Sequence, residues 1–290
     1  MNKYISLFLV ALLLGCNTDE FFDQEQPLAN LNPDPIQSTT DMSKIIAGVY
    51  WGFIGRNESS WSNPFDCKRG FLELASDELR VSSPAIPSYD QQGNSYFQYN
   101  RIVDLIQGDG GMGPNMWHQC YNQISSVNVV IALFEDNMPE PPFKDNIEQH
   151  DQIRGEAYFL RGYFYWLLST VFPPPYDHSG NNENLQGLPL RLKQIPGLEN
   201  ASTPLSNLEV TYQQLIADMD SARKYLPEFI GMGRTNKAAA EAMLSRIHLS
   251  MGEYDKALEM CNAVINGPYD LQLEERPFDA FARTKFDRSL

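Results

Sequence analysis

"AMLSRIHLSMGEYDKALEMCNAVI", residues 242–265, has the pattern of two helices joined by a tight turn. Apolar residues recur at helical spacing on both sides of Gly252, and glycine readily adopts the positive φ that such a turn requires. The small residues Ser245 and Ala257 fall where two antiparallel helices would touch, and Tyr254 is expected to pack back onto the first helix. The predicted helices cover residues 235–250 and 254–266.

The residues of this pair fall at the offsets of a tetratricopeptide unit, in which helix pairs stack side by side. A faint echo lies upstream, where Ala157-x3-Arg161 matches Ala242-x3-Arg246. We therefore expect a mainly α fold that is built on tetratricopeptide-type helix pairs. Further apolar stripes at helical spacing predict helices that include residues 42–53, 117–128, 153–168 and 208–226.

Two sequence patterns resemble the capping boxes that begin helices. They pair Asp145 with Glu148 and Ser206 with Glu209. Each precedes an apolar stripe, so the sequence predicts that these side chains cap the two helices that follow.

Two stretches lack helical periodicity. Residues 55–113 are rich in Gly, Pro, Ser, Asn and aromatic residues, and we expect loops and short helices there. Residues 177–206 are polar and interrupted by Pro and Gly, and we expect a second loop. The first stretch is the larger, and we interpret it as a loop-rich insertion that binds a ligand.

The N-terminus has the pattern of a bacterial lipoprotein signal. A short positive start precedes an apolar run that is too short to span a bilayer, and the run ends at Leu13-Leu14-Gly15-Cys16. We expect residues 1–15 to be a signal peptide, Cys16 to be acylated, and residues 16–40 to be a lipidated tether. The alternative is an ordinary secretory signal that happens to contain a cysteine. Residues 41–290 would form the helical domain.

Charge and cysteine content exclude several classes of protein. With 37 acidic and 22 basic residues the net charge is −15, which argues against a nucleic-acid partner and against electrostatic docking on anionic lipid. Beyond Cys16, only Cys67, Cys120 and Cys261 remain, without the spacing of a disulfide scaffold or zinc site. A Cys67–Cys120 disulfide is compatible with the sequence but not required by it, and Cys261 is expected in the core.

Two patterns that suggest chemistry are better explained without it. Residues 108–113 spell GxGxxG, but a dinucleotide site needs a preceding strand, and the surroundings are helical. Glu73, Asp77 and Glu78 place carboxylates near one another, as in a glycosidase, but neighbouring acids usually mark a solvated helix face. HExxH and GxSxG are absent from the sequence, so we expect no catalysis, no cofactor and no metal site.

Aromatic residues crowd the first loop-rich stretch. Sugar rings present apolar C–H faces and hydroxyl rims, so a sugar site needs flat aromatic side chains with polar groups at their edges. We expect Trp61, Tyr96 and Tyr99 to stack on a ligand, and Asp77 and Arg101 to hydrogen-bond with it. The alternative is ordinary core packing, which uses the same residue types.

Four stretches together resemble the SusD/RagB family of outer-membrane nutrient-binding lipoproteins. "LASDEL" contains Asp77, and the segment with Trp117, Tyr121, Ile124 and Asn128 matches a W-x3-Y-x2-I-x3-N frame. The two others are "RGEAYFLRGYFYWLLSTVF", with Gly162 where alanine is usual, and residues 233–271, which match best. The resemblance covers essentially the whole chain, and "DMSKIIAGVYWGF" adds a first helix of the family type.

The resemblance implies a SusD-like helical fold and a cell-surface position in the outer membrane. It implies that the protein captures oligosaccharides or peptides and passes them to a TonB-dependent, SusC-like transporter without catalysis. Asp19-Glu20 after Cys16 resembles the signal that directs such lipoproteins outward. Relatives continue into a C-terminal region that we expect to be missing here, so that residues 41–290 represent the N-terminal part.

Two other functions remain open at the level of sequence. A helical-repeat scaffold that binds only a protein partner would have no affinity for saccharides. A surface glycosidase would turn over an oligosaccharide.

Overall fold

The computed structural model describes residues 36–54, 112–138, 140–193, 202–228 and 233–268. Within these ranges no helix is both long and apolar enough to cross a membrane. The elements in chain order are α3 (Thr39–Ile54), α6 (Met112–Asp136), η3 (Ile147–Gln149), α7 (His150–Ser169), η4 (Asn182–Asn184), β1 (Gln186–Pro189), β2 (Leu205–Asn207), α8 (Leu208–Tyr225), α9 (Lys237–Ser250) and α10 (Tyr254–Ile265).

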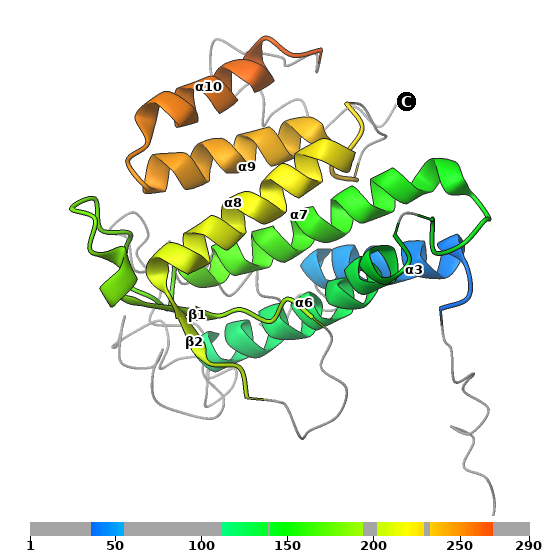
Figure 1. The fold of residues 1–290 in the computed structure, drawn as a ribbon, viewed down its shortest axis with the longest axis horizontal. Helices are drawn as coiled ribbons and strands as arrows, with labels where there is room; N and C mark the ends of the chain where they lie inside the picture. The colour runs from blue at the N-terminus through cyan, green and yellow to red at the C-terminus, as the bar shows by residue number, and fades with distance from the viewer. Residues whose placement is uncertain (1–35, 55–111, 139, 194–201, 229–232, 269–290) are drawn as a thin grey trace, which may run out of the picture.

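The long helices stack in chain order (Figure 1). α6 packs on α7, α7 on α8, α8 on α9 and α9 on α10, while α3 lies against α6 and α7. Successive neighbours in the chain are therefore neighbours in space, as in stacked helix pairs. The predicted mainly helical fold is confirmed.

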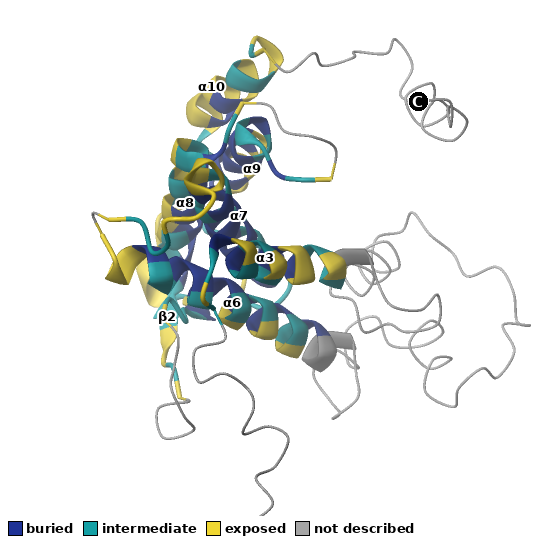
Figure 2. Ribbon diagram, turned by 90° about the vertical axis from the view of Figure 1, so that its right-hand side faces the viewer, coloured by how far each residue is buried: buried dark blue, intermediate teal, exposed yellow. Residues whose placement is uncertain are grey.

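The predicted inward faces form the core between these helices (Figure 2). On α7 the buried residues follow the 3.6-residue period of the sequence pattern, and the same holds for α8. Burial of each large apolar side chain contributes about 1.5–3 kcal/mol to the free energy of folding. The confirmed core positions are Met42, Ile46 and Val49 of α3, Ile153, Ala157, Leu160, Phe164 and Leu168 of α7, and Leu208, Tyr212, Leu215, Met219 and Ala222 of α8.

Gly162 explains how closely α7 approaches α8. A Cβ atom at this position would lie 2.9 Å from Met219 Cε and 3.0 Å from Asp218 Cβ. The family-like segment usually has alanine here, and in this chain a methyl group would crowd Asp218 and the flexible end of Met219. The glycine therefore suits the close contact between the two central helices.

The predicted capping boxes are wrong. The Asp145 carboxylate accepts a hydrogen bond from the backbone N–H of Thr39, at 3.1 Å, and so satisfies the first turn of α3 rather than its own helix. Asn207, not Ser206, caps α8, because its side chain accepts from Val210 N at 2.8 Å. Ser206 instead donates to Leu188 O at 2.8 Å.

An unpredicted cap begins α3. Ser38 Oγ donates to Asp41 Oδ2 at 2.7 Å and accepts from Asp41 N at 3.2 Å. Together with Asp145, this arrangement satisfies donors that a helix N-terminus leaves without intrahelical partners.

The stretch expected to be a plain polar loop contains a small antiparallel sheet. β1 pairs with β2, with Gln186 opposite Asn207 and Pro189 opposite Leu205. Gly187 permits this pairing beside α8, because a Cβ atom there would collide with Thr211 Oγ1. The sheet brings the chain after β1 close to α6.

The α9–α10 pair is a helix hairpin, as predicted. Gly252 in the turn has φ +75°, and Ser245 Oγ donates to Ala257 O at 3.0 Å across the seam between the helices. Two expectations are wrong: Tyr254 is 65% exposed, and Cys261 is exposed with its Sγ 2.9 Å from Ser245 Oγ. Both residues follow the helical period, but α10 has no helix of the described chain against its outer face.

Candidate functional site

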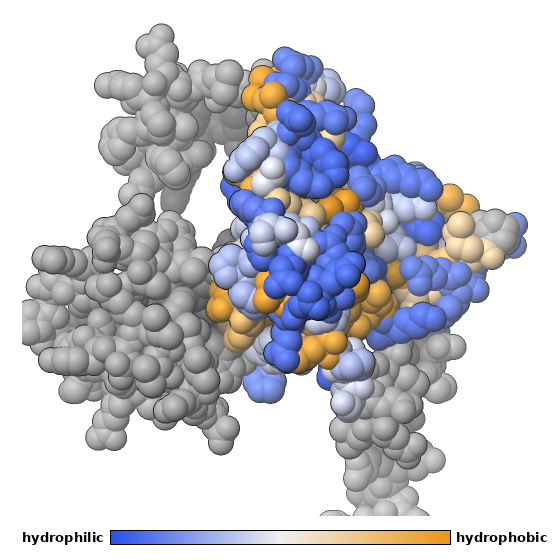
Figure 3. Space-filling model, turned by 60° about the vertical axis from the view of Figure 1, so that its left-hand side comes forward, coloured by the Kyte–Doolittle hydropathy of each residue, from blue (hydrophilic) through white to orange (hydrophobic). Residues whose placement is uncertain are grey.

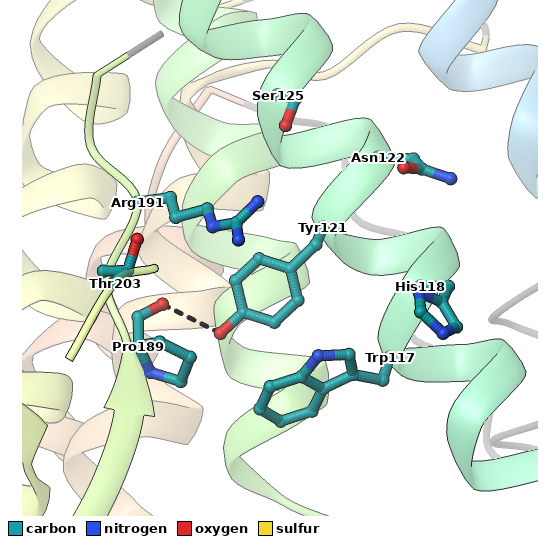
Figure 4. A pocket seen from close by; sticks show the side chains of 8 residues that line it. All are labelled: Trp117, His118, Tyr121, Asn122, Ser125, Pro189, Arg191 and Thr203. Carbon is teal, nitrogen blue, oxygen red and sulfur yellow. Dashed lines mark hydrogen bonds between the residues drawn. The ribbon is translucent and has the colours of Figure 1, made fainter. Parts of the chain in front are cut away.

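A pocket of about 240 Å³ lies between α6 and the chain that follows β1 (Figure 4). Its volume is below the roughly 300–1,000 Å³ that is typical for drug-sized ligands, so it suits a single ring. The pocket is lined by Trp117, His118, Tyr121, Asn122, Ser125, Pro189, Arg191 and Thr203.

The first wall is one face of α6. Trp117 and Tyr121 are four residues apart, so their side chains lie one turn from each other on the same side of the helix. Asn122 and Ser125 lie beside them and are exposed. Ile124 is fully buried and holds α6 against the core. The pocket is therefore lined along the border between the buried and the solvent-facing sides of α6.

The two aromatic rings of this wall are fixed by neighbouring rings. The Trp117 centroid lies 4.9 Å from that of Tyr121, with planes at 45°, and 4.9 Å from that of Phe172 in an edge-on contact. The Tyr121 ring also meets Tyr165 edge-on at 6.2 Å. Because neighbouring rings already hold these two side chains in place, they lose little further conformational entropy when a ligand binds.

The second wall is fixed through its backbone carbonyl groups. Tyr121 Oη donates to Pro189 O at 2.8 Å, and burial raises the pKa of this phenol, so it remains a protonated donor. Asn128 Nδ2 and Tyr165 Oη both donate to Arg191 O, at 2.7 and 2.9 Å. These contacts join segments that are more than 20 residues apart in sequence and set the width of the pocket.

A buried ion pair lies behind this wall. Arg161 contacts Asp218 through two hydrogen bonds, Nη2 to Oδ1 at 2.7 Å and Nε to Oδ2 at 2.9 Å. Arg161 Nη1 also donates to Asn128 Oδ1 at 3.1 Å and to Leu192 O at 3.2 Å. Arg161 thus orients the amide of Asn128, whose other end holds Arg191. The W-x3-Y-x2-I-x3-N frame consequently supplies two pocket rings, one core residue and one anchor.

The lining combines aromatic rings with neutral polar groups and one guanidinium. Its eight residues include no Asp or Glu, so the described pocket has no carboxylate pair of the kind that glycoside hydrolysis uses. In the part of the chain that the structure describes, no three His, Cys, Asp or Glu side chains come close enough to hold a metal ion. Flat rings beside hydroxyl, amide and guanidinium groups suit a ring-shaped, hydroxylated ligand.

The candidate residues of the sequence analysis lie outside the described residues. This applies to Cys16, Trp61, Asp77, Tyr96, Tyr99 and Arg101, to Glu73 and Glu78, and to Cys67. Of the GxGxxG stretch, only Met112 and Gly113 are described, and they begin α6.

Sequence reasoning identified Trp117 and Tyr121 as members of a helical frame but not as pocket residues, and it did not single out Arg191 or Thr203. The i, i+4 spacing of the two rings was the available signal. The approach of Pro189, Arg191 and Thr203 to α6 had no local signal, because it depends on how the chain folds back onto this helix.

Comparisons with known proteins give the same family at the level of sequence and of fold. SusD-like protein P2 of Formosa agariphila is 26% identical over 291 residues, covering 97% of this chain and 50% of that protein. A SusD superfamily protein from Bacteroides thetaiotaomicron superposes with a TM-score of 0.65 at 22% identity, covering 82% of this chain and 48% of that one.

A structure described as a laminarin binding SusD-like protein superposes with a TM-score of 0.61 at 20% identity, covering 87% of this chain and 50% of that one. The chain thus spans about half the length of the relatives it matches. A SusD-like family described as "Starch-binding associating with outer membrane" matches residues 24–249. The chain belongs to this SusD-like family.

Proposed function

We propose that this protein captures glycans at the cell surface and does no chemistry on them. The observation that carries the proposal is the pocket on α6, where the Trp117 and Tyr121 rings lie beside Asn122, Ser125 and Arg191. Family membership supports it, because the family is described as starch-binding, and so does the fold shared with a laminarin binding protein.

The pocket would hold a sugar through two kinds of contact. The C–H face of a pyranose ring packs on an aromatic ring, while its hydroxyl groups bond with amide and hydroxyl side chains at the rim. Each stacked ring contributes about 1 kcal/mol, and a sugar loses bound water at every hydroxyl that it buries. We therefore expect modest affinity and a need for several subsites.

Further subsites would come from the stretch between α3 and α6. Trp61, Tyr96 and Tyr99 are proposed to stack on neighbouring sugar residues, and Asp77 and Arg101 to bond with their hydroxyls. This stretch precedes α6 in the sequence, and α6 begins at Met112, five residues before Trp117. The proposal is that an oligosaccharide bound in the pocket also contacts these residues.

We further propose a surface position and a transporter partner. Acylated Cys16 would anchor the chain in the outer membrane, and the captured glycan would pass to a TonB-dependent, SusC-like transporter. Two observations support the surface position. The sequence Leu13-Leu14-Gly15-Cys16 has the pattern of a lipoprotein signal, and the family description names association with the outer membrane.

Calorimetric titration of residues 1–290 in detergent with a panel of oligosaccharides tests glycan capture. At least one should bind, and Trp117→Ala should weaken that binding about 5- to 10-fold, the equivalent of one lost stacking contact. Trp51→Ala is the matched control, because this tryptophan on α3 is 56% exposed and does not line the pocket. Trp61→Ala and Tyr96→Ala should also weaken binding.

The outcomes separate the parts of this proposal. If no oligosaccharide binds the wild-type chain, glycan capture is wrong. If Trp117→Ala binds as wild type while Trp61→Ala does not, the pocket is not the site. Release of products from any oligosaccharide would establish a glycosidase and contradict the non-catalytic role.

Membrane fractionation tests the anchor. Cys16→Ala should leave the membrane fraction and the detergent phase, because no acyl chain can then be attached. If the variant still fractionates with the outer membrane, acylation of Cys16 is not the attachment.

A second candidate function, a scaffold for a protein partner, is favoured by the outer face of α10. Tyr254, Leu258 and Ile265 are 65%, 60% and 54% exposed and share one side of the helix, and Leu249 of α9 is 56% exposed. The side of the molecule in Figure 3 is mainly hydrophilic, with small apolar patches that include one at the level of α10. Loss of transporter co-purification in Leu258→Glu, with no glycan binding in any variant, would favour the scaffold.

A further inference from the structure

We infer that the outer face of α10 joins two copies of this chain through an antiparallel contact between their α10 helices. This inference goes beyond glycan capture and does not depend on it. It follows from the position of α10 in the stack, from the spacing of its exposed apolar residues and from the charges beside them.

α10 is the outermost of the stacked helices that the structure describes (Figure 1). α7 packs on α6 and α8, and α8 packs on α7 and α9, whereas the main helical neighbour of α10 is α9. Only Ala257 and Met260 of α10 are buried among the described residues. The stacking that covers both sides of the inner helices therefore leaves one face of α10 open.

The open face carries an apolar stripe, which consists of Tyr254, Leu258, Cys261 and Ile265. All four residues are exposed, and Tyr254 is the most exposed at 65%. Their spacings of four, three and four residues are those of the seam along which two helices pack in a coiled coil. The stripe is therefore a surface on which another helix can pack.

This stripe is complementary to itself. Spacings of four, three and four residues read the same in both directions, so a second α10 related by a two-fold axis presents the same pattern in reverse. Tyr254 of each copy then meets Ile265 of the other, and Leu258 meets Cys261, which packs as a small apolar residue. The stack of helices continues in this way from one copy into the other.

The charges beside the stripe fit the antiparallel arrangement. Asp255 lies next to the stripe in the first turn of α10, while Asn262 and Asn266 occupy the same side near its C-terminal end. In the antiparallel register Asp255 of one copy lies beside these amides of the other, which can donate hydrogen bonds to its carboxylate. Glu259 lies about 100° round the helix from Leu258, on the side away from the stripe. No acidic side chain of α10 therefore opposes another across the seam.

Association through this seam should be weak. Four residues over about 18 Å of helix form a contact smaller than most stable interfaces, and each copy has a net charge of −15. We expect a dissociation constant on the order of 10–100 μM. It should fall about two- to threefold as sodium chloride rises from about 50 to about 500 mM, because salt screens the repulsion between copies.

Sedimentation equilibrium of residues 1–290 in detergent tests the contact, with Cys16→Ala in every sample so that acyl chains do not hold copies together. This parent chain should show the expected monomer–dimer equilibrium. Leu258→Glu should weaken association about tenfold or more, because two carboxylates would enter the seam, and its circular dichroism should be unchanged. Val210→Glu is the matched control, because it adds the same charge at an exposed apolar residue of α8 and should change association less than about twofold.

Thiol cross-linking tests the register. In Leu258→Cys under mild oxidation, the new thiol should form a disulfide with Cys261 of the other copy, and adding Cys261→Ser should abolish this covalent dimer. In the parent chain the two Cys261 thiols should not pair, because the antiparallel register offsets them by about three residues and separates their Cα atoms beyond the reach of a disulfide.

Two kinds of result would overturn the inference. A parent chain that stays monomeric well above the expected dissociation constant, or a Leu258→Glu variant that associates as tightly as the parent, would leave the stripe to a helix of a different protein. A covalent dimer of the parent chain through Cys261 would contradict the antiparallel register. Glycan binding is measured separately by the titrations above, so failure here leaves the proposed function standing.

Discussion

The α7–α8 pair and the α9–α10 pair differ mainly in what surrounds them. α7 has neighbours on both sides, and 14 of its 20 residues are buried, whereas only 2 of the 12 residues of α10 are buried. The more tetratricopeptide-like sequence belongs to the outer pair. Similarity to a repeat pattern therefore predicts the hairpin itself but not how deeply it lies in the stack.

The short sequence echo between the pairs shows the same difference. Arg161 of α7 is 4% exposed and paired with Asp218, which is 1% exposed, while Arg246 of α9 is exposed. Ala157 is fully buried, and Ala242 is exposed. Equal spacing in sequence thus gives opposite environments. Neighbouring helices cover the side of α7 that carries Ala157 and Arg161, whereas the corresponding side of α9 is exposed to solvent.

The largest expected effect is at the buried ion pair. Asp218→Asn keeps the side-chain shape but leaves the charge of Arg161 without its counter-ion, so the free energy of unfolding should fall by about 3–5 kcal/mol. Asp220→Asn on the same helix is the control, because its pair with Arg223 is half-exposed and contributes roughly 0–1 kcal/mol. Denaturant unfolding measures both. Equal losses would mean that burial does not distinguish the two pairs.

The next effect concerns the seam of the outer pair. Ala257 is 6% exposed, and Ala257→Glu would force a carboxylate between α9 and α10, at a cost on the order of 3 kcal/mol. Because α10 packs mainly on α9, faster amide exchange should be confined to these helices. Leu258→Glu, on the exposed side of the same helix, should change stability by less than about 0.5 kcal/mol. A melting temperature of Ala257→Glu within a degree or two of wild type would contradict the assigned face.

A smaller effect is expected at the close approach of α7 and α8. Gly162→Ala should destabilise the protein by up to about 2 kcal/mol. Overpacking of the contact with Asp218 and Met219 costs about 1–3 kcal/mol, and the higher helix propensity of alanine offsets about 0.5–1 kcal/mol of this. Gly48→Ala in α3 is the matched control. Nothing lies within 4 Å of a Cβ atom there, so alanine should stabilise the helix by about 0.5–1 kcal/mol. The melting temperature should therefore fall in Gly162→Ala and rise in Gly48→Ala. Shifts of both melting temperatures in the same direction would contradict the packing argument.

The smallest effect is at the turn between α9 and α10. Glu253 contacts His248 Nδ1 at 2.6 Å and Lys256 Nζ at 2.7 Å. Partial burial alone would raise the pKa of Glu253, but hydrogen bonds from Lys256 and His248 lower it below its ordinary value of 4.5. The contacts of Glu253 with His248 and Lys256 should together stabilise the fold by a few tenths of a kcal/mol.

The pH dependence of this contribution follows from the direction of the shift. A carboxyl with a lowered pKa stabilises the fold above its ordinary pKa and loses that contribution as the pH falls through the lowered value. Glu253→Gln should therefore be less stable than wild type at pH 6. The difference should shrink as the pH falls below 4.5 and disappear once the pH is below the lowered pKa of Glu253. A difference that persists in strong acid would show that the effect is not ionic.

The helices were predictable because their signal is local. Apolar residues at a 3.6-residue period fix the inward face of a helix wherever it packs, which is why Ile153, Leu160 and Phe164 are buried as expected. The caps were not predictable in the same way. Asp145 satisfies α3 across 106 residues of sequence, and its spacing to Glu148 gave a misleading local match.

The sequence by itself determined the helical class, the inward faces, the turn at Gly252 and the family. Only the tertiary structure decided that Arg161 is buried while Arg246 is not, and that Trp117 and Tyr121 share a pocket with Arg191. Periodicity describes one helix at a time and carries no information about what packs against it. The pocket depends on hydrogen bonds such as that from Tyr121 to Pro189, whose partners are 68 residues apart and meet only after the helices have stacked.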